Sequence, residues 1–380
     1  MGKLIKIMSI IGTRPEAIKI APVLQRLDRT GELESILVAT AQHRELLDEV
    51  LNLFGLEPDY DLDVMSKKQS LTTVTIKILQ KLKEIIMQEE PDLILVHGDT
   101  TTTFAAAVAA FYQQVKIVHI EAGLRSYDKY APYPEEINRK LTSGLADLHF
   151  APTEENYDNL LNENIDSETI FVSGNTVIDT VLETYQEGYQ FDNPILNDIL
   201  DKEGKIILVT AHRRENLGQR LRQICRALDQ LVEIKPNLRI VFPVHPNPKV
   251  REVVYNLLDK QSRIALLEPL GYKEFINLLA RSDLVLTDSG GLQEEAPALD
   301  KPVLVLREKT ERQAGVKAGT LELVGTDRQR IVTSVQRLLD SKEVYRKMAA
   351  AENPYGDGEA SRRIVDYLKY YFDLIDEKPI

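Results

Sequence analysis

The feature that most constrains the fold of this chain is a regular alternation of short apolar runs with longer segments of helical period. The runs have strand length, and most are apolar on both faces, as a buried parallel sheet requires. In the first half they are LIKIMSII from Leu4, ILVA from Ile36, LILVHG from Leu93, KIVHIEAG from Lys116 and LHFAPT from Leu148. Helical segments such as PEAIKIAPVLQRL lie between them, which predicts βαβ units and a doubly wound parallel sheet.

The second half of the chain repeats this alternation. Its runs are KIILVTAH from Lys205, LRIVFPVH from Leu238, IALLEP from Ile264, LVLTDSGG from Leu284 and PVLVL from Pro302. A chain of 380 residues exceeds the size, about 250–300 residues, at which a single core stops growing. We therefore expect two Rossmann-like α/β domains, residues 1–175 and 176–362, facing a cleft. Residues 363–380 should form a final helix that packs on either domain or crosses between them, with the first domain as the candidate.

Composition narrows the possible partners. The net charge of −12 and the lack of a dense Lys/Arg block argue against nucleic acid, because phosphates require a basic face. The single cysteine, Cys225, allows no intrachain disulfide, which is typical of a reducing compartment. Arg14, Pro15 and Glu16 interrupt the first apolar run, so we expect a buried strand and no signal peptide or membrane span. These features predict a cytoplasmic protein.

Ligands of doubly wound sheets bind at the carboxyl ends of the strands, so polar motifs directly after strands are the candidate site. The first is GTRPEAIK, which brings Arg14 and Lys19 to a helix N-terminus, where anions are favoured. A well-capped helix with solvated charges is the alternative. Capping explains Thr13 and Glu16, but it does not explain a positive charge at a helix start. The motif has no GxGxxG or Walker pattern, so no dinucleotide cofactor is expected.

Carboxylates follow two neighbouring strands and the next loop. Asp99 lies in HGDTTTT, Glu121 in IEAGLRS and Glu135 in PYPEEINR, and Arg125 and Arg139 lie in the same segments. Clustered carboxylates raise one another's pKa, which makes a general acid available near neutral pH. Alternatively, Asp99 is only a helix cap. A divalent ion could bind such a cluster, but nothing requires one, and the Cys/His spacing of a structural zinc is absent.

In the second half, HRREN places His212 and Arg213 directly after a strand. Histidine titrates near neutral pH, and adjacent arginines can bind phosphate oxygens. HPNP places His245 after another strand, where a structural role is equally possible.

The motif TDSGGLQEEAP carries the most specific local signal. Ser289, Gly290 and Gly291 would let a phosphate approach backbone N–H groups at a helix start. Glu295, one turn further on, could accept hydrogen bonds from both hydroxyls of a ribose. The alternative is a glycine-rich tight turn without a ligand.

Taken together, the motifs resemble a known family. GTRPEAIK, HGDTTTT, IEAGLRS, PYPEEINR, FAPTE, GNTVID, HRREN, HPNP, TDSGGLQEEAP and NPYGDGEASRRI occur in the order found in the bacterial non-hydrolysing UDP-N-acetylglucosamine 2-epimerases. The resemblance implies a glycosyltransferase-B-like fold, a homodimer and no cofactor. It also implies interconversion of UDP-N-acetylglucosamine and UDP-N-acetylmannosamine, by elimination of UDP to 2-acetamidoglucal and re-addition with inversion at carbon 2. The product would serve surface polysaccharides.

The resemblance also implies residue roles. Asp99, Glu121 and Glu135 would do acid/base work, with His212 near the departing phosphate. Substrate-binding roles are implied for Arg14, Lys19, Arg139, Arg213, His245, Ser289, Gly290, Gly291, Glu295 and Arg312. A second UDP-N-acetylglucosamine, acting as an allosteric activator, would contact Gln42, His43, Glu136 and Arg213.

Three other functions compete with this interpretation. A hydrolysing epimerase would release free N-acetylmannosamine, and it differs from the first choice only in water access. A glycosyltransferase of the same fold would need one catalytic base, so three carboxylates argue against it. A non-catalytic nucleotide-sugar sensor should have lost one of Asp99, Glu121, Glu135 and His212, and all four are present.

Overall fold

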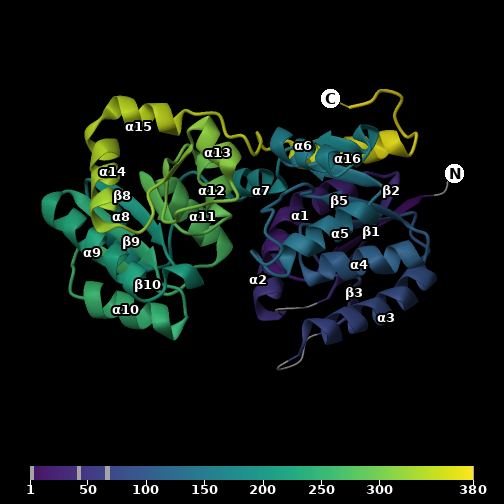
Figure 1. Cartoon of the computed structure of the whole chain (residues 1–380), viewed down its shortest axis with the longest axis horizontal. Helices are drawn as coiled ribbons and strands as arrows, with labels where there is room; N and C mark the ends of the chain where they lie inside the picture. The colour runs from purple at the N-terminus through teal and green to yellow at the C-terminus, as the bar shows by residue number, and fades with distance from the viewer. Residues whose placement is uncertain (1–3, 41–43, 65–68, 380) are drawn as a thin grey trace. The chain divides into compact units, whose positions relative to one another are not determined.

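The chain forms two compact units in the computed structural model, which describes residues 4–40, 44–64 and 69–379 (Figure 1). Unit 1 comprises Met1–Thr180 and Tyr355–Ile380, and unit 2 comprises Val181–Pro354. These bounds differ from the expected junctions after residues 175 and 362. Asp179 explains the difference, because its carboxylate accepts the backbone N–H groups of Ala360 and Ser361 and thereby ties both segments to unit 1.

Unit 1 is built on a parallel sheet, which has seven strands within the described residues, in the order β3-β2-β1-β4-β5-β6-β7. The order reverses between β1 and β4, which is the switch point where doubly wound sheets bind ligands. The strands are β1 (Ile5–Ile11), β2 (Leu33–Ala39), β3 (Tyr60–Asp61), β4 (Leu93–His97), β5 (Lys116–Ile120), β6 (Leu148–Ala151) and β7 (Ile170–Val172).

Helices cover both faces of this sheet. Met8 and Ile10 of β1 pack in a core with α3 and the buried alanines of α4, while Ile7 and Ile11 are buried on the opposite face, where α1 contacts β1 and α16. The helices of unit 1 are α1 (Arg14–Asp28), α2 (Arg44–Phe54), α3 (Leu71–Glu89), α4 (Thr101–Tyr112), α5 (Glu135–Leu145), α6 (Glu154–Asn162), η1 (Ser167–Thr169) and α16 (Ala360–Tyr371), while α7 (Thr176–Thr184) contains the boundary between the units.

The final helix belongs to unit 1. Arg26 of α1 donates from Nε to Ser361 Oγ of α16 at 2.7 Å. The helix is shorter than the expected span of 363–380, since it ends at Tyr371 and Asp373 adopts a left-handed conformation with φ of 55°.

Unit 2 is a second doubly wound parallel sheet, with the order β10-β9-β8-β11-β12-β13 and its switch point between β8 and β11. One core joins Ile207 and Val209 of β8 to α9, α10 and α14. The strands are β8 (Lys205–Thr210), β9 (Leu238–Pro243), β10 (Ile264–Leu267), β11 (Leu284–Thr287), β12 (Val303–Val305) and β13 (Leu321–Leu323). The helices are α8 (Pro194–Leu200), η2 (Arg214–Asn216), α9 (Gln219–Ile234), α10 (Pro248–Leu258), α11 (Tyr272–Arg281), α12 (Leu292–Glu295), η3 (Pro297–Leu299), α13 (Gln313–Ala318), α14 (Arg328–Asp340) and α15 (Lys342–Ala349).

The fold class is therefore confirmed as α/β with two doubly wound parallel sheets. The cleft stays a prediction. Across the ranges that the structure describes, no helix combines the length and the apolarity that a membrane crossing requires.

Candidate active site

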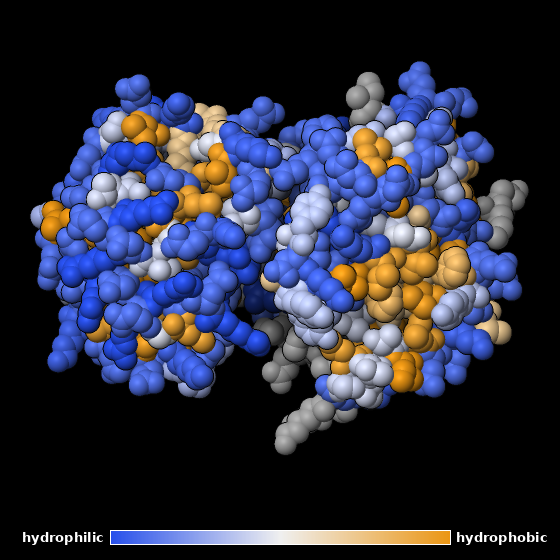
Figure 2. Space-filling view, viewed as in Figure 1, coloured by the Kyte–Doolittle hydropathy of each residue, from blue (hydrophilic) through white to orange (hydrophobic). Residues whose placement is uncertain are grey.

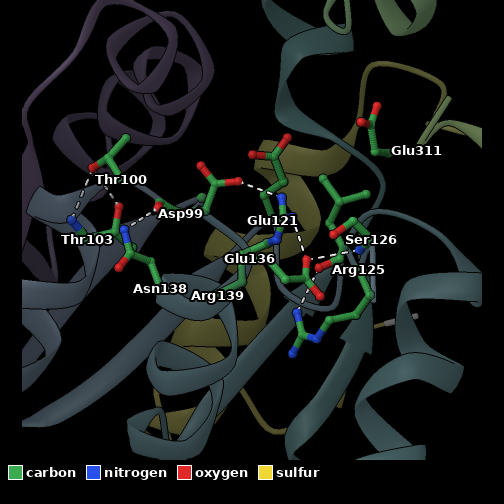
Figure 3. A network of polar contacts seen from close by, with 12 residues as sticks. Asp99, Thr100, Thr103, Glu121, Arg125, Ser126, Glu136, Asn138, Arg139 and Glu311 are labelled. Carbon is green, nitrogen blue, oxygen red and sulfur yellow. Dashed lines mark hydrogen bonds and ion pairs between the residues drawn. The ribbon is translucent and has the colours of Figure 1, made fainter. Parts of the chain in front are cut away.

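The loops after β1, β4 and β5 bring charged side chains together in unit 1 (Figure 3). Glu121 directly follows β5, and its Oε1 accepts hydrogen bonds from Lys19 Nζ and, at 3.0 Å, from Asn175 Nδ2. Its Oε2 lies 3.8 Å from His97 Nδ1. Glu121 is 9% exposed and has φ of +64°, a backbone conformation that a non-glycine residue seldom adopts and that clusters at functional sites. The contacts from three segments hold this carboxylate at the strand end.

Asp99 lies in the loop after β4. Its Oδ2 accepts from Arg139 Nη1 at 2.7 Å, and its backbone oxygen accepts from Asn138 Nδ2 at 3.0 Å. Burial raises the pKa of Asp99, and the charge of Arg139 opposes this rise. The carboxylates of Glu121 and Glu135 raise the pKa further, so Asp99 retains its proton to a higher pH than an ordinary aspartic acid. The negative charges of Glu121 and Glu135 therefore act on Asp99 in the same direction as burial.

Glu136 and Glu135 begin α5, and the structure gives them different surroundings. Glu136 is 1% exposed, and Arg139 Nη2 donates to its Oε2 at 2.7 Å. Burial raises the pKa of Glu136, but the hydrogen bonds from Ser126 and Arg139 outweigh burial and hold it below its usual value. Glu135 is half-buried, and its Oε2 has no hydrogen-bond partner within the described part of the chain.

The loop after β1 is organised by Glu16. Its Oε2 accepts the backbone N–H groups of Gly12 and Thr13 at 2.9 and 2.7 Å, which is the capping box at the start of α1. Its Oε1 accepts from Thr100 Oγ1 at 2.6 Å and from Thr103 Oγ1 at 2.9 Å, at the start of α4. Burial raises the pKa of Glu16. Glu16 therefore does more than cap a helix, since it joins the loops on both sides of the switch point.

The remaining predicted residues of unit 1 differ in their placement. Arg14 is half-buried at the first position of α1, and its side chain makes no hydrogen bond or ion pair within the described ranges. Arg125 is turned away from the carboxylate cluster, because Nε and Nη2 pair with both oxygens of Glu163 at 2.9 and 2.7 Å. Arg125 therefore pairs with a carboxylate outside the cluster of Asp99, Glu121 and Glu135. Gln42 and His43 lie outside the described residues.

In unit 2, the loop after β8 wraps around Asp288, which follows β11 and is fully buried. Asp288 Oδ2 accepts the backbone N–H groups of His212 and Arg213, each at 2.9 Å, and Asn216 Nδ2 at 2.9 Å. Burial lowers the pKa of His212, and the charge of Asp288 opposes this shift. The His245 ring stacks on the His212 ring, with centroids 5.2 Å apart and planes 6° apart. The two predicted histidines therefore form one aromatic pair.

Two guanidinium groups converge at Gly290. A Cβ atom at this position would lie 3.2 Å from Arg312 Nη1 and 3.4 Å from Arg213 Nη2. Arg312 is held by Glu294, which accepts its Nε at 2.8 Å, and Arg213 by Asp288, whose backbone oxygen accepts its Nε at 2.9 Å. Two oriented guanidiniums beside a glycine offer a place for phosphate oxygens.

The acidic side chain expected for ribose, Glu295, lies at the end of α12, the short helix that follows Gly291. The Glu295 carboxylate is 3.9 Å from the point where Gly291 would carry a Cβ atom. Ser289 N–H donates to Thr287 Oγ1 at 2.9 Å, and Gln293 Nε2 donates to the Ser289 carbonyl at 2.9 Å, which fixes the turn. The structure thus brings together the residues predicted after β8, β9, β11 and β12.

Four supporting residues were missing from the predicted site: Glu16, Asn175, Asn216 and Asp288. Each belongs to a motif that the sequence singled out, namely GTRPEAIK, GNTVID, HRREN and TDSGG. Their side chains act on other loops, however, so spacing along the chain gave no sign of their partners.

Two doubly wound sheets, each with charged loops after the carboxyl ends of its strands, define a two-domain α/β enzyme of glycosyltransferase-B-like fold. A family model described as UDP-N-acetylglucosamine 2-epimerase matches residues 25–369. The chain belongs to this family and is an enzyme of the epimerase class, which confirms the resemblance seen in the sequence.

Individual relatives match over the full length. The UDP-N-acetylglucosamine 2-epimerase of Bacillus subtilis is 49% identical over 377 residues, which are 99% of this chain and 98% of that protein. The structure of UDP-GlcNAc 2-epimerase from Neisseria meningitidis bound to UDP-GlcNAc matches with a TM-score of 0.89 and 46% identity, over 96% of this chain and 100% of that chain. The S. aureus MnaA–UDP co-structure matches with a TM-score of 0.89 and 51% identity, over 98% of each chain.

Proposed function

We propose that this chain is a non-hydrolysing epimerase that interconverts UDP-N-acetylglucosamine and UDP-N-acetylmannosamine. The Neisseria relative is bound to UDP-GlcNAc and the S. aureus relative to UDP, which supports a UDP-sugar as the substrate here. Carbon 2 of the sugar has no neighbouring carbonyl, so its proton is too weakly acidic for simple removal. Breaking the bond from carbon 1 to UDP first builds positive charge on the ring and makes that proton labile. Loss of both gives 2-acetamidoglucal and bound UDP, which then recombine.

The observation that carries this proposal is the contrast between Asp99 and Glu121. Glu121 accepts hydrogen bonds from a lysine and an amide, donors that suit an ionised carboxylate. Burial, by contrast, raises the pKa of Asp99. Such a pair has one carboxylate ready to accept a proton and another able to hold one. Removal on one face of carbon 2 and delivery on the other requires this combination, with Glu135 as the third acid/base group.

Unit 2 supplies the nucleotide contacts in this proposal. Arg213 and Arg312 bind the diphosphate beside Ser289, Gly290 and Gly291, and Glu295 binds the ribose. His212, stacked on His245, assists the departing phosphate. In unit 1, Arg14, Lys19 and Arg139 contribute positive charge next to the carboxylates. The positive groups support retention of UDP, which a non-hydrolysing reaction needs.

The test is a product assay with UDP-N-acetylglucosamine, followed by ¹H and ³¹P NMR. We expect UDP-N-acetylmannosamine with its diphosphate intact. Asp99→Asn and Glu121→Gln should each lower kcat by at least about 100-fold, since general acid–base groups contribute about 10²–10⁴-fold. Glu163→Gln, which removes another carboxylate–arginine pair of unit 1, is the matched control and should leave kcat within about twofold of wild type. Free N-acetylmannosamine as the main product would support a hydrolysing enzyme instead.

The resemblance also supports proposals on regulation and assembly. We propose a cytoplasmic homodimer in which a second UDP-N-acetylglucosamine activates the enzyme. The activation is tested by the rate from UDP-N-acetylmannosamine alone: a slow rate that rises on addition of UDP-N-acetylglucosamine is expected. A full rate without that addition contradicts obligatory activation.

A further inference from the structure

We propose that Glu136 is a positioning residue that orients the catalytic Asp99 through Arg139, and so links the loop between β5 and α5 to the reacting carboxylate. The inference rests on the proposed function for the role of Asp99. It differs from the direct contact with an activator that the family resemblance implies for Glu136.

Both carboxylate oxygens of Glu136 accept hydrogen bonds within the fold. Oε2 accepts the backbone N–H of Ser126 at 2.9 Å and Arg139 Nη2 at 2.7 Å. Oε1 accepts the backbone N–H of Tyr127 at 3.0 Å. The side chain is 1% exposed, so these contacts are shielded from solvent. Glu136 therefore holds the start of the loop in place.

Arg139 connects Glu136 to Asp99. The Arg139 side chain is only 3% exposed, and it is shared between Glu136 on one side and Asp99 Oδ2, at 2.7 Å, on the other (Figure 3). Asn138, the preceding residue, donates to the Asp99 backbone oxygen. The first turn of α5 thus holds both the side chain and the main chain of the loop after β4.

Glu136 also acts on Asp99 through charge. Arg139 is one cation between two carboxylates, and its charge lowers the pKa of Asp99 against the effect of burial. Glu136 offsets part of that positive charge because it is ionised and 2.7 Å from the same guanidinium. Without the negative charge of Glu136, Arg139 would act on Asp99 alone. The pKa of Asp99 would then fall.

The loop that Glu136 holds is accessible at its outer side. Tyr127, Tyr130 and Tyr133 lie in it with 66%, 68% and 63% of their surface exposed. Glu136 therefore fixes the backbone of a loop whose tyrosine side chains are themselves exposed.

The experiment compares full-length wild type, Glu136→Gln and Glu163→Gln. The carboxyl ¹³C signal of Asp99, assigned with Asp99→Asn, is titrated by NMR, and kcat and KM are measured with UDP-N-acetylglucosamine from pH 6 to 9. In Glu136→Gln we expect a lower apparent pKa of Asp99, a shift of the kcat profile to lower pH, and a loss of about 10- to 100-fold in kcat at neutral pH with KM changed less than threefold. Glu163→Gln, which removes a comparable pair with Arg125, should leave the titration and the profile as in wild type.

An unchanged or raised pKa of Asp99 in Glu136→Gln overturns the proposal, as does an equal shift in Glu163→Gln. If the wild-type protein shows no epimerisation, the proposed function is contradicted. The NMR titration of Asp99 in wild type and Glu136→Gln then still decides whether Glu136 positions Asp99. If Glu136→Gln does not fold, Glu136→Asp takes its place. It keeps the charge but shortens the side chain, so we expect a lower kcat at an unchanged pH midpoint, and a wild-type kcat would overturn the proposal.

Discussion

The Nδ1 atom of His212 lies 3.3 Å from Oδ1 of Asp288, a carboxylate with no exposed surface. The same carboxylate accepts the backbone N–H groups of His212 and Arg213 and the side chain of Asn216. Asp288 therefore fixes both the ring of the histidine and the loop that carries it. Contacts of this kind are typical of residues that orient a catalytic imidazole.

Replacing Asp288 with asparagine should loosen both the His212 ring and the loop that carries it. Asparagine keeps only one accepting oxygen, so its NH2 group must face donors that now reach the other oxygen, at least the His212 N–H groups at Oδ1, and we expect a loss of about 1–3 kcal/mol in the free energy of unfolding. The affinity for UDP should fall about tenfold, because Arg213 and His212 lose their fixed positions. Urea denaturation and calorimetric titration with UDP measure the two effects. Wild-type values in both would show that Asp288 has no orienting role.

Gly290 gives a second prediction, on phosphate binding. A Cβ atom there would lie 3.2–3.4 Å from the guanidiniums of Arg312 and Arg213, which must move by a few tenths of an ångström. In Gly290→Ala we expect about a tenfold weaker affinity for UDP, or about 1.4 kcal/mol, with little change in stability. Gly31→Ala is the matched control, since no atom lies within 4 Å of its Cβ position. Equal UDP affinity in the two variants would refute a phosphate-binding site at Gly290.

A third prediction concerns acid stability. Burial lowers the pKa of His119 from its ordinary 6.5 to about 3, and Nε2 lies 2.7 Å from the Gly98 carbonyl oxygen. Because the folded-state pKa is depressed, the unfolded chain binds the additional proton, so the stability that His119 provides is present above pH 6.5 and is lost as pH falls toward 3.

Replacing His119 with glutamine isolates this effect, because an amide can still donate to Gly98. Between pH 6 and 4.5, the free energy of unfolding should fall with pH in both proteins. The slope for the variant should be smaller than the slope for wild type, and the difference should be about 1.4 kcal/mol per pH unit. Urea midpoints at successive pH values give both slopes. Equal slopes would mean that His119 does not remain neutral in the folded state.

A fourth prediction concerns assembly. Exposed apolar side chains lie on three neighbouring helices of unit 1: Ile76 on α3, Phe111 and Tyr112 on α4 and Leu141 on α5 each have 47–68% of their surface exposed. Figure 2 shows this apolar area over α3 and α4. Apolar areas of this kind mark interaction sites, and a second copy of the chain is the occupant that the proposed dimer requires.

Placing a charge on this face should therefore prevent association. Phe111→Glu is expected to halve the molar mass measured by light scattering, while Ile195→Glu, at an exposed apolar residue of unit 2, should leave it unchanged. A dimer that survives Phe111→Glu would place the interface elsewhere.

The central strands could be predicted from the sequence because they are buried on both faces and therefore continuously apolar. Strands β3, β7 and β13 were not predicted. All three lie at sheet edges and are only two or three residues long, which is too short for a hydropathy pattern to stand out, and β3 and β13 also contain the polar residues Asp61 and Glu322.

The candidate site was predictable in its location but not in its contacts. The carboxyl ends of all strands in a parallel sheet lie on the same side of the sheet, so the residues that follow the strands had to gather there. The direction of each side chain depends on partners distant in the sequence. Arg125 turns to Glu163, 38 residues away, and Asn175 reaches Glu121 across 54 residues. No local pattern encodes such pairs, and the same holds for the tie between Asp179 and α16 that moves the unit boundary.

The most direct test of the account is incubation with UDP-N-acetylglucosamine in deuterated water. Elimination and re-addition of UDP require that the proton at carbon 2 leaves and is replaced from the enzyme. We therefore predict UDP-N-acetylmannosamine that carries deuterium at carbon 2 and retains its link to UDP, measured by mass spectrometry and ¹H NMR. A mannosamine product without deuterium at carbon 2 would contradict the account.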